Sequence, residues 1–280
     1  MEKISGKAEE ALAEYLKNRF VIPDGFENDA ALRNADDSFA DRWKPVMERA
    51  EEAGAAEAAA EYLLKGREPF HFRDPDGVSM QIYPSAAGRV PVITLRDTAD
   101  FENLIVNAAF GGKRPENLSR MGALFLYNKS NRFILLSSKP YSNVPAEELG
   151  LAEDDWAEKS MKIRLEHECT HYFTKQFFGS AANNLHDELI ADFFGLENAF
   201  GFYKAEYFLR FLGLTGKSGG RFQIYLESLP AEVREEISPL LEEIVRKAAI
   251  RAEAWSETEA FRKMDQIQKI TFLCRKNMAE

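Results

Sequence analysis

The sequence predicts an α+β protein in which a small mixed sheet precedes a mainly helical region. Short alternations of apolar and polar residues, typical of strands, are confined to residues 69–140. Apolar residues at every third or fourth position, typical of amphipathic helices, predominate from about residue 155 onward. We therefore expect three segments: a helical one over 1–66, a mixed core over 67–200 and a helical lobe over 201–280.

The overall composition is that of an ordinary globular protein. Of the 280 residues, 45% are hydrophobic and 29% are charged, and the formal net charge is -10. An acidic surface repels phosphate backbones, so we expect no nucleic-acid partner. The chain has no apolar run of bilayer length, no signal-peptide core at its start and only two cysteines. These features predict a cytoplasmic protein without a membrane partner, and they leave its oligomeric state open.

Two helical stretches are expected in the N-terminal segment. The first covers residues 8–20 and ends before Pro23, which cannot continue a helix. The second covers residues 37–65, is rich in Ala and Glu, and is divided by Gly54. Nothing in either stretch indicates chemistry, so we interpret both as packing helices.

The middle segment should contain two hairpins around one helix. The turn at 74–77 would join the first two strands, and a polar loop at 128–131 would join the last two. The helix should cover 97–110. The expected strands are 70–72, 78–83, 90–95, 122–127 and 132–137.

Two helices are then expected on either side of residue 180. The first covers 156–178, has acidic residues at its start and ends at Gly179, a natural C-cap. Asn184 can cap the second, with Asp187 three residues on in a capping-box-like arrangement. Helices over 202–212, 231–254 and 257–276 should follow Gly201.

The helix before Gly179 contains the pattern His-Glu-x-x-His, formed by His167, Glu168 and His171. Residues four apart on an α-helix differ by about 40° around the axis and about 6 Å along it, so the two imidazoles can converge on one cation. Zinc is the usual ion at nitrogen-rich tetrahedral sites. Glu168 flanks that face, where a carboxylate can take the proton of a zinc-bound water whose pKa is lowered to roughly 7.

Glu188 is the candidate for a third ligand. His171 lies roughly 10 Å before the end of its helix. A five-residue loop and the first turn of the next helix can cover that distance in reverse, since extended residues reach up to about 3.3 Å each. Asp192 lies one turn beyond Glu188 on the same face. It can accept the outward N–H of a ligand histidine and so fix the orientation of the ring.

This pattern resembles that of the zincin metallopeptidases. The acidic third ligand, followed four residues later by Asp, is similar to the gluzincin branch of that family. The resemblance covers residues 155–195 and implies a zincin-like fold, zinc as cofactor, a peptide or protein substrate, and hydrolysis by a zinc-bound water. The roles it implies are zinc ligands for His167, His171 and Glu188, general base for Glu168 and orienting carboxylate for Asp192.

The chain departs from the family pattern in two ways. The spacer between His171 and Glu188 is somewhat shorter than in familiar members, and Asp187 stands where Asn is often found. The resemblance further implies an active-site cleft between a sheet lobe and a helical lobe. In such enzymes an edge strand of the sheet pairs with the extended substrate, and residues 132–137 are the candidate for that strand.

Peptide hydrolysis also needs a hydrogen-bond donor for the oxyanion. Tyr203 follows a break in the helical pattern and can swing back over the cleft, so we predict it as the catalytic donor. Tyr172 is an alternative, although core packing explains it more simply. His186 lies about 160° around the helix from Glu188, and we expect it to cap or pack.

Two alternatives to a zinc peptidase stay open. The protein could bind zinc without peptidase activity, as a structural site or a peptide-binding cleft, although a purely structural site would not need Glu168. The motif could also be an accident in an all-helical interaction protein. Metal content of the purified chain separates the last reading from the others, and peptide cleavage by Glu168→Gln separates the first two.

Overall fold

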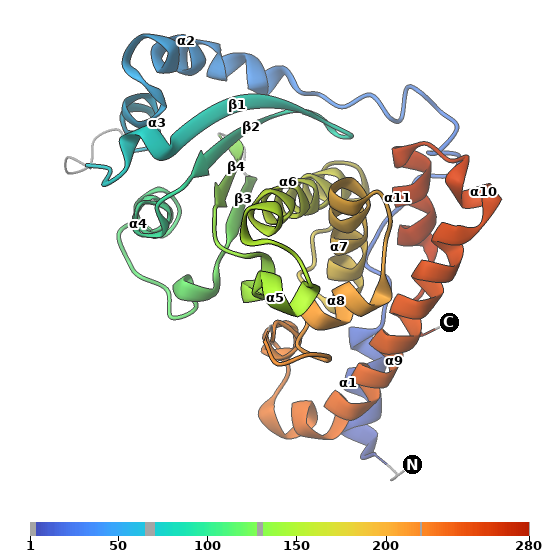
Figure 1. Cartoon of the computed structure of the whole chain (residues 1–280). Coiled ribbons are helices and arrows are strands. Elements are labelled where there is room, and N and C mark those ends of the chain that lie inside the picture. The colour runs from blue at the N-terminus through green and yellow to red at the C-terminus, as the bar shows by residue number, and fades with distance from the viewer. Residues whose placement is uncertain (1–3, 65–70, 128–130, 219, 280) are drawn as a thin grey trace.

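The computed structural model describes residues 4–64, 71–127, 131–218 and 220–279 (Figure 1). The strands are β1 (Val78–Ser85), β2 (Gly88–Leu95), β3 (Ala123–Tyr127) and β4 (Arg132–Ser137). The α-helices are α1 (Gly6–Tyr15), α2 (Lys44–Ala53), α3 (Ala55–Leu63), α4 (Thr98–Ala108), α5 (Ala146–Leu149), α6 (Glu153–Phe178), α7 (Leu185–Phe200), α8 (Ala205–Phe211), α9 (Ala231–Glu257), α10 (Glu259–Arg262) and α11 (Gln266–Arg275). Shorter 3₁₀ helices include η1 (Ser38–Trp43), η3 (Leu118–Arg120), η4 (Tyr141–Asn143) and η5 (Phe222–Leu226).

The four strands form one mixed sheet in the order β1-β2-β4-β3. β1 and β2 make an antiparallel hairpin, and so do β3 and β4. β2 and β4 run parallel, with Val92 opposite Ile134, and the chain between them passes through α4 and β3. The mixed α+β architecture expected from the sequence is therefore confirmed: a small sheet accompanies a mostly helical remainder.

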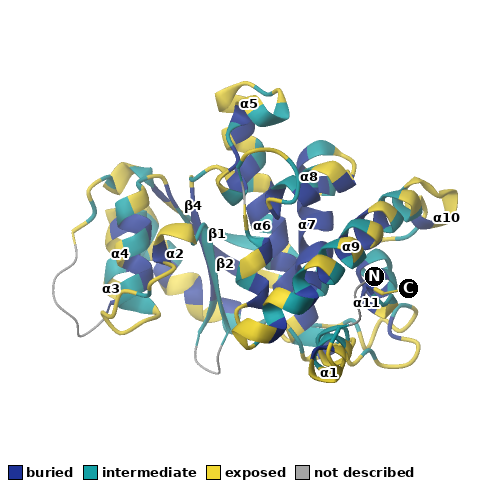
Figure 2. Ribbon diagram, turned by 90° about the horizontal axis from the view of Figure 1, so that it is seen from below, coloured by how far each residue is buried: buried dark blue, intermediate teal, exposed yellow. Residues whose placement is uncertain are grey.

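The sheet buries both of its faces. Ile93 and Leu135 pack with residues of α3 and α4 in one hydrophobic core, whereas Val92 and Ile134 belong to a second core formed with α6 and α7. Figure 1 shows α2, α3 and α4 on one side of the sheet and α6 on the other. Burial is densest along α6 and α7, which lie between the sheet and the outer helices (Figure 2). The division of the chain at residues 66 and 200 stays a prediction.

The α6 and α7 helices pack closely because of one glycine. A Cβ atom at Gly195 would lie 2.8 Å from the backbone oxygen of Ile163 and 2.8 Å from its Cγ2 atom. Only glycine therefore allows this approach of the two backbones. As expected, α6 ends at Gly179 in the left-handed conformation, and Asn184 caps α7 by accepting hydrogen bonds from the N–H groups of His186 and Asp187. The expected capping box does not form, because the Asp187 carboxylate accepts from the N–H of Asn183 and not from that of Asn184.

Two local predictions are wrong. β1 pairs with β2 through a turn at residues 86–87, and residues 71–72 form no strand; residue 70 lies outside the described residues. The turn at 74–77 contains a short 3₁₀ helix at Pro75–Gly77 and precedes β1 instead of closing a hairpin. The expected helix over 257–276 is also divided, because Asp265 forms a capping box with Gln268 and starts α11 anew.

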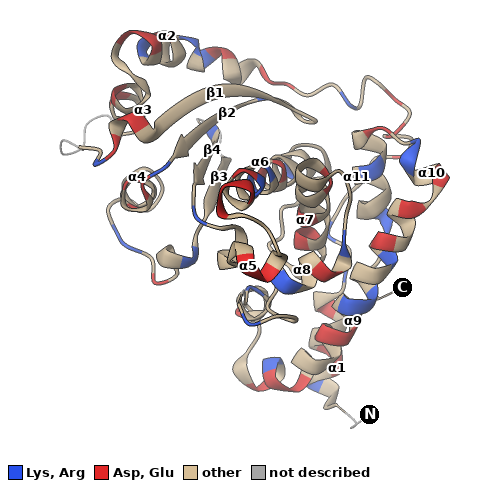
Figure 3. Ribbon diagram, in the orientation of Figure 1, with Lys and Arg blue, Asp and Glu red and all other residues tan. Residues whose placement is uncertain are grey.

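The outer helices complete the molecule. α9 packs against α7, and α1 packs along α9 although α1 and α9 are more than two hundred residues apart in the sequence. Lys and Arg alternate with Asp and Glu along α9, as Figure 3 shows, in keeping with a solvated outer face. No helix in the described part of the chain is long and apolar enough to cross a bilayer.

Candidate metal centre

Three expected ligands meet between α6 and α7. The Nε2 atoms of His167 and His171 lie 3.0 Å apart. Glu188 places its Oε1 atom 3.4 Å from His171 Nε2 and its Oε2 atom 3.6 Å from His167 Nε2. Ligand atoms of a tetrahedral zinc site with bonds of about 2.0–2.1 Å lie about 3.3–3.4 Å apart. The three side chains thus form a triangle of the size that one zinc ion requires.

The outward nitrogen of each histidine faces an aspartate. His167 Nδ1 lies 2.8 Å from Asp192 Oδ1, and His171 Nδ1 lies 3.5 Å from Asp187 Oδ2. A carboxylate at Nδ1 keeps the proton on that nitrogen and leaves the Nε2 lone pair free for a metal. Asp192 therefore lies where the sequence predicted an orienting carboxylate for His167. Asp187 lies in the corresponding place for His171, at the longer distance.

Asp192 and Glu188 are held by three side chains that the sequence does not single out. The Tyr141 hydroxyl, on η4, donates to Asp192 and lies 2.9 Å from His167 Nδ1. The Arg221 guanidinium forms an ion pair with Asp192 and lies 3.5 Å from Glu188 Oε2. Tyr225, on η5, donates to Glu188 at 2.6 Å. These contacts fix the carboxylates at the back of the site.

The charges of the buried groups reinforce one another. Burial by itself would raise the pKa of Glu188, but His167, His171 and Arg221 hold it well below its usual range. Burial likewise opposes ionisation of Asp192, whose pKa is nevertheless lowered by Arg221 and His167. Burial would lower the pKa of His171, but the Asp187 and Glu188 carboxylates raise it well above its usual value. The site therefore attracts positive charge strongly.

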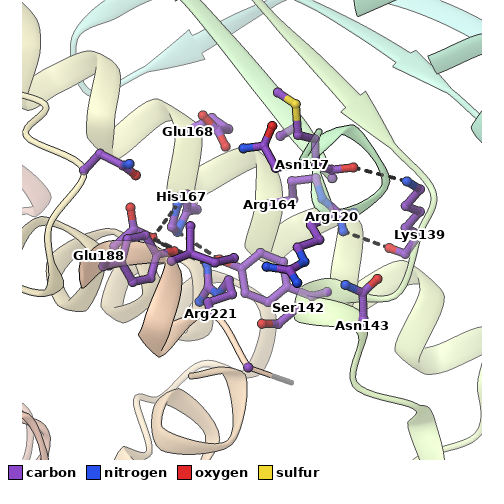
Figure 4. A pocket seen from close by; sticks show the side chains of 18 of the residues that line it. Asn117, Arg120, Lys139, Ser142, Asn143, Arg164, His167, Glu168, Glu188 and Arg221 are labelled. Atoms are coloured by element: carbon purple, nitrogen blue, oxygen red, sulfur yellow. Dashed lines mark hydrogen bonds and ion pairs between the residues drawn. The ribbon is translucent and has the colours of Figure 1, made fainter. Parts of the chain in front are cut away.

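A cavity of about 540 Å³ opens in front of the three ligands (Figure 4). Glu168 lies on its wall, half-buried, and makes no hydrogen bond or ion pair with the described residues. Its carboxylate is thus accessible to a molecule in the cavity, as the general-base prediction requires. Cys169 is buried on the other side of α6 and does not line the cavity.

Tyr203 does not reach the cavity, so its predicted role as oxyanion donor is wrong. Its ring stacks on Phe193 with the centroids 4.7 Å apart, and its buried hydroxyl has no partner in the described structure. The left-handed turn at Gly201 directs the chain under α7, where an aromatic ring gains more from burial than from exposure in the cleft. Tyr172 also belongs to the core, against Phe125.

The predicted edge strand is wrong as well. Residues 132–137 form β4, which lies inside the sheet because β2 pairs with it in parallel. The edge on the cavity side is β3, and Met121, Gly122 and Ala123 at its start line the cavity. Pairing partners depend on residues far away in the sequence, so strand patterning alone could not distinguish β3 from β4.

Among the Arg and Tyr residues of the cavity that the sequence did not predict, only Arg164 has a sequence spacing that places it near the site. Arg164 precedes His167 by three residues and Glu168 by four, so helical spacing places it on the same face of α6. Tyr141, Arg221 and Tyr225 come from loops and short 3₁₀ turns, where no periodicity predicts a direction for a side chain.

The comparison with known families concerns the second half of the chain. DUF7005, a family of unknown function, matches residues 125–280. The chain belongs to DUF7005. No curated protein and no solved structure matches it. The matched region contains α6, α7 and all three candidate ligands, whereas β1, β2, α4 and η3 precede it.

Proposed function

We propose that this DUF7005 protein is a zinc-dependent metallopeptidase of the gluzincin type with a zincin-like arrangement of sheet, active-site helix and helical lobe. The observation that carries the proposal is the triangle of His167, His171 and Glu188, whose ligand atoms all lie within 4.8 Å of one another. A free carboxylate, Glu168, lies beside it on the same cavity. A purely structural zinc site would have no use for that carboxylate.

The geometry supports the following role for each residue. His167, His171 and Glu188 would hold zinc, which when bound supplies a Lewis acid that acidifies a water molecule. Glu168 takes a proton from the attacking water and delivers it to the amine that leaves. Asp192, braced by Tyr141 and Arg221, keeps the His167 ring in place while charge develops.

Arg221 is our candidate for the oxyanion donor, the role that the sequence suggested for Tyr203. It lines the cavity next to Glu188, and its side chain is 18% exposed. A guanidinium offers five N–H donors, so donors remain beyond its contacts with Asp192, Glu188 and Tyr141. A fixed positive charge at this position would stabilise the oxyanion formed when water adds to a peptide carbonyl.

The alternative is a protein of the same fold that binds zinc without cleaving peptides. The cavity would then hold a peptide, or the ion would only stabilise the α6–α7 pair. The cytoplasmic location and the lack of nucleic-acid and membrane partners remain predictions from composition.

The decisive experiment compares wild type with Glu168→Gln, both loaded with one equivalent of zinc. We expect zinc retention in both and a loss of peptide hydrolysis of about a hundredfold or more in the variant, because a positioned general base contributes about 10²–10⁴-fold. Glu158→Gln, at an exposed position on the same helix, is the matched control and should hydrolyse normally. Equal hydrolysis by Glu168→Gln contradicts the mechanism, and a zinc-loaded wild type without hydrolysis favours the alternative.

A further inference from the structure

One part of the cavity wall is basic. Arg120, Lys139 and Arg164 line it, and Glu168 and Glu188 are the acidic residues that line the cavity. In the view of Figure 4, Arg120 and Arg164 lie between the ligand side and Lys139. This is unusual in a chain with a net charge of -10. Figure 3 shows further Lys and Arg along the segment that joins α4 to β3.

Arg164 is a buried cation without a carboxylate partner. It is 3% exposed, and its Nη1 and Nη2 atoms donate to the carbonyl oxygens of Ser137 and Lys139, each at 2.8 Å. No carboxylate of a described residue lies within ion-pair distance of it, and its Nε–H has no partner among those residues. Burial lowers its pKa to about 10, although the nearby Tyr141 and Glu168 oppose this shift. A buried guanidinium that forms no direct ion pair is costly, so an anion that paired with Arg164 would stabilise it.

Arg120 adds a second uncompensated charge to the same wall. It is exposed on η3, and its side chain makes no hydrogen bond or ion pair with the described residues. Lys139 differs, because Glu102 neutralises it at 3.1 Å. Two guanidinium groups that line the cavity therefore form no ion pair with the described residues, and an anion from outside can bind both.

If the anion is part of a peptide substrate, the position of Arg164 indicates how far it lies from the scissile bond. Arg164 lies one helical turn, about 5–6 Å, before the base Glu168 on the same face of α6. Helical side chains lean toward the N-terminus, which moves the guanidinium further from the ligands. One residue of extended peptide spans about 3.3–3.6 Å. A group one or two residues beyond the scissile bond would thus reach Arg164, with Met121, Gly122 and Ala123 alongside it.

We propose that Arg164 and Arg120 bind the free C-terminal carboxylate of a peptide, one or two residues beyond the bond that is cleaved. The planar fork of a guanidinium matches a carboxylate in two parallel hydrogen bonds. The protein would then remove one or two residues from peptide C-termini. This inference rests on the proposed peptidase function and adds the substrate class to it.

The first test compares three substrates of the zinc-loaded protein. They are an N-acetylated tripeptide of alanine, its C-terminal amide, and an amide of the same length that ends in aspartate. We expect kcat/KM for the free acid to exceed that for the alanine amide by about tenfold or more, as for a lost charge-assisted contact. Equal rates for acid and amide would overturn the inference. A preference for the aspartate amide would also overturn it, since the carboxylate would then come from a side chain.

Arg120→Gln tests the subsite without disturbing the fold, because Arg120 is exposed. It should lower the ratio of the rate for the free acid to the rate for the amide severalfold or more. Arg42→Gln is the matched control, since Arg42 is an exposed arginine outside the cavity. An unchanged acid-to-amide ratio in Arg120→Gln, together with an unchanged ratio in Arg164→Lys, would contradict the assignment.

Binding to zinc-loaded Glu168→Gln separates failure of this inference from failure of the proposed function. Calorimetry with the uncleaved acid and amide should show at least about tenfold tighter binding of the acid, and Arg120→Gln introduced into that protein should weaken only the acid. Tighter binding of the acid with no hydrolysis by wild type would retain the carboxylate subsite and reject the peptidase. Hydrolysis by wild type with equal binding of acid and amide would reject the subsite alone.

Discussion

The two walls of the cavity differ in how their charged side chains are paired. On the ligand wall, formed by His167, His171 and Glu188, the carboxylates and histidines are supported from behind by partners such as Asp192 and Arg221. On the basic wall, formed by Arg120 and Arg164, neither guanidinium group forms an ion pair with the described residues. According to our proposals, a zinc ion would bind at the first wall and a substrate carboxylate at the second.

If both proposals hold, the ligand wall binds the ion and the basic wall selects the substrate. The ligand wall is rigid because two long helices meet at Gly195 and because its charges are paired inside the protein. Substitutions there should change metal affinity. The basic wall is proposed to bind a substrate from solution, so substitutions there should change substrate preference and leave the metal in place. Four predictions test the part of this comparison that concerns the ligand wall.

The largest effect is expected from His171→Ala. Loss of one ligand from a three-residue site should lower zinc affinity by about a thousandfold or more, because structural zinc binding is worth more than 10 kcal/mol in total. The measurement is competition for zinc with a chelator. His71→Ala, at an exposed position outside the cavity, is the matched control and should bind zinc as wild type does. Normal zinc affinity in His171→Ala would contradict the assignment of His171 as a zinc ligand, and with it the comparison of the two walls.

A smaller effect should separate the two aspartates. Asp192→Asn should weaken zinc binding about 10–100-fold, since Asp192 contacts His167 at 2.8 Å and orients its ring. Asp187→Asn should cost less than that, because its contact with His171 measures 3.5 Å. Zinc titrations of both variants provide the comparison. The reverse order would show that Asp187 is the main orienting carboxylate.

Zinc affinity should also depend on pH in a defined direction. In the metal-free protein, the Asp187 and Glu188 carboxylates hold the pKa of His171 well above its usual value. The lowered pKa values of Glu188 and Asp192 keep both carboxylates ionised at neutral pH. Zinc must therefore displace a proton from His171, and apparent affinity should rise with pH, by up to about tenfold per unit, until the pH exceeds that raised pKa.

Chelator competition at about pH 6, 7 and 8 measures the slope. Asp187→Asn removes a carboxylate that raises the pKa of His171, so its slope should be smaller in this range. A zinc affinity that is independent of pH in wild type would mean that His171 carries no proton in the metal-free protein.

The smallest effect is expected from Tyr141→Phe. Its hydroxyl donates to Asp192, which keeps its contacts with His167 and Arg221 in the variant. Loss of one buried hydrogen bond of about 1 kcal/mol should weaken zinc binding severalfold. Tyr203→Phe is the control, because the Tyr203 hydroxyl has no partner in the described structure. An effect of Tyr203→Phe on zinc affinity or on kcat would restore a role for that residue in the site.

The sequence predicted local features well and long-range ones poorly. The caps at Gly179 and Asn184 were correct because a helix end is decided by a few neighbouring residues. The hairpin at 74–77 was wrong because several turns compete for each strand, and the pairing with β2 decides among them. Tyr203 was wrong because an aromatic ring beside a helix end can turn toward a cleft or a core, and only packing determines which.

The sequence by itself determined the chemistry that one helix face can offer. Helical spacing alone places His167, Glu168 and His171 together, since four residues make about one turn. The tertiary structure decided what surrounds that face. Tyr141 and Arg221 come from segments that only folding brings to the site, and β3 became the edge because β2 pairs with β4. Contacts between distant segments depend on the packing of the whole chain, and no local pattern encodes them.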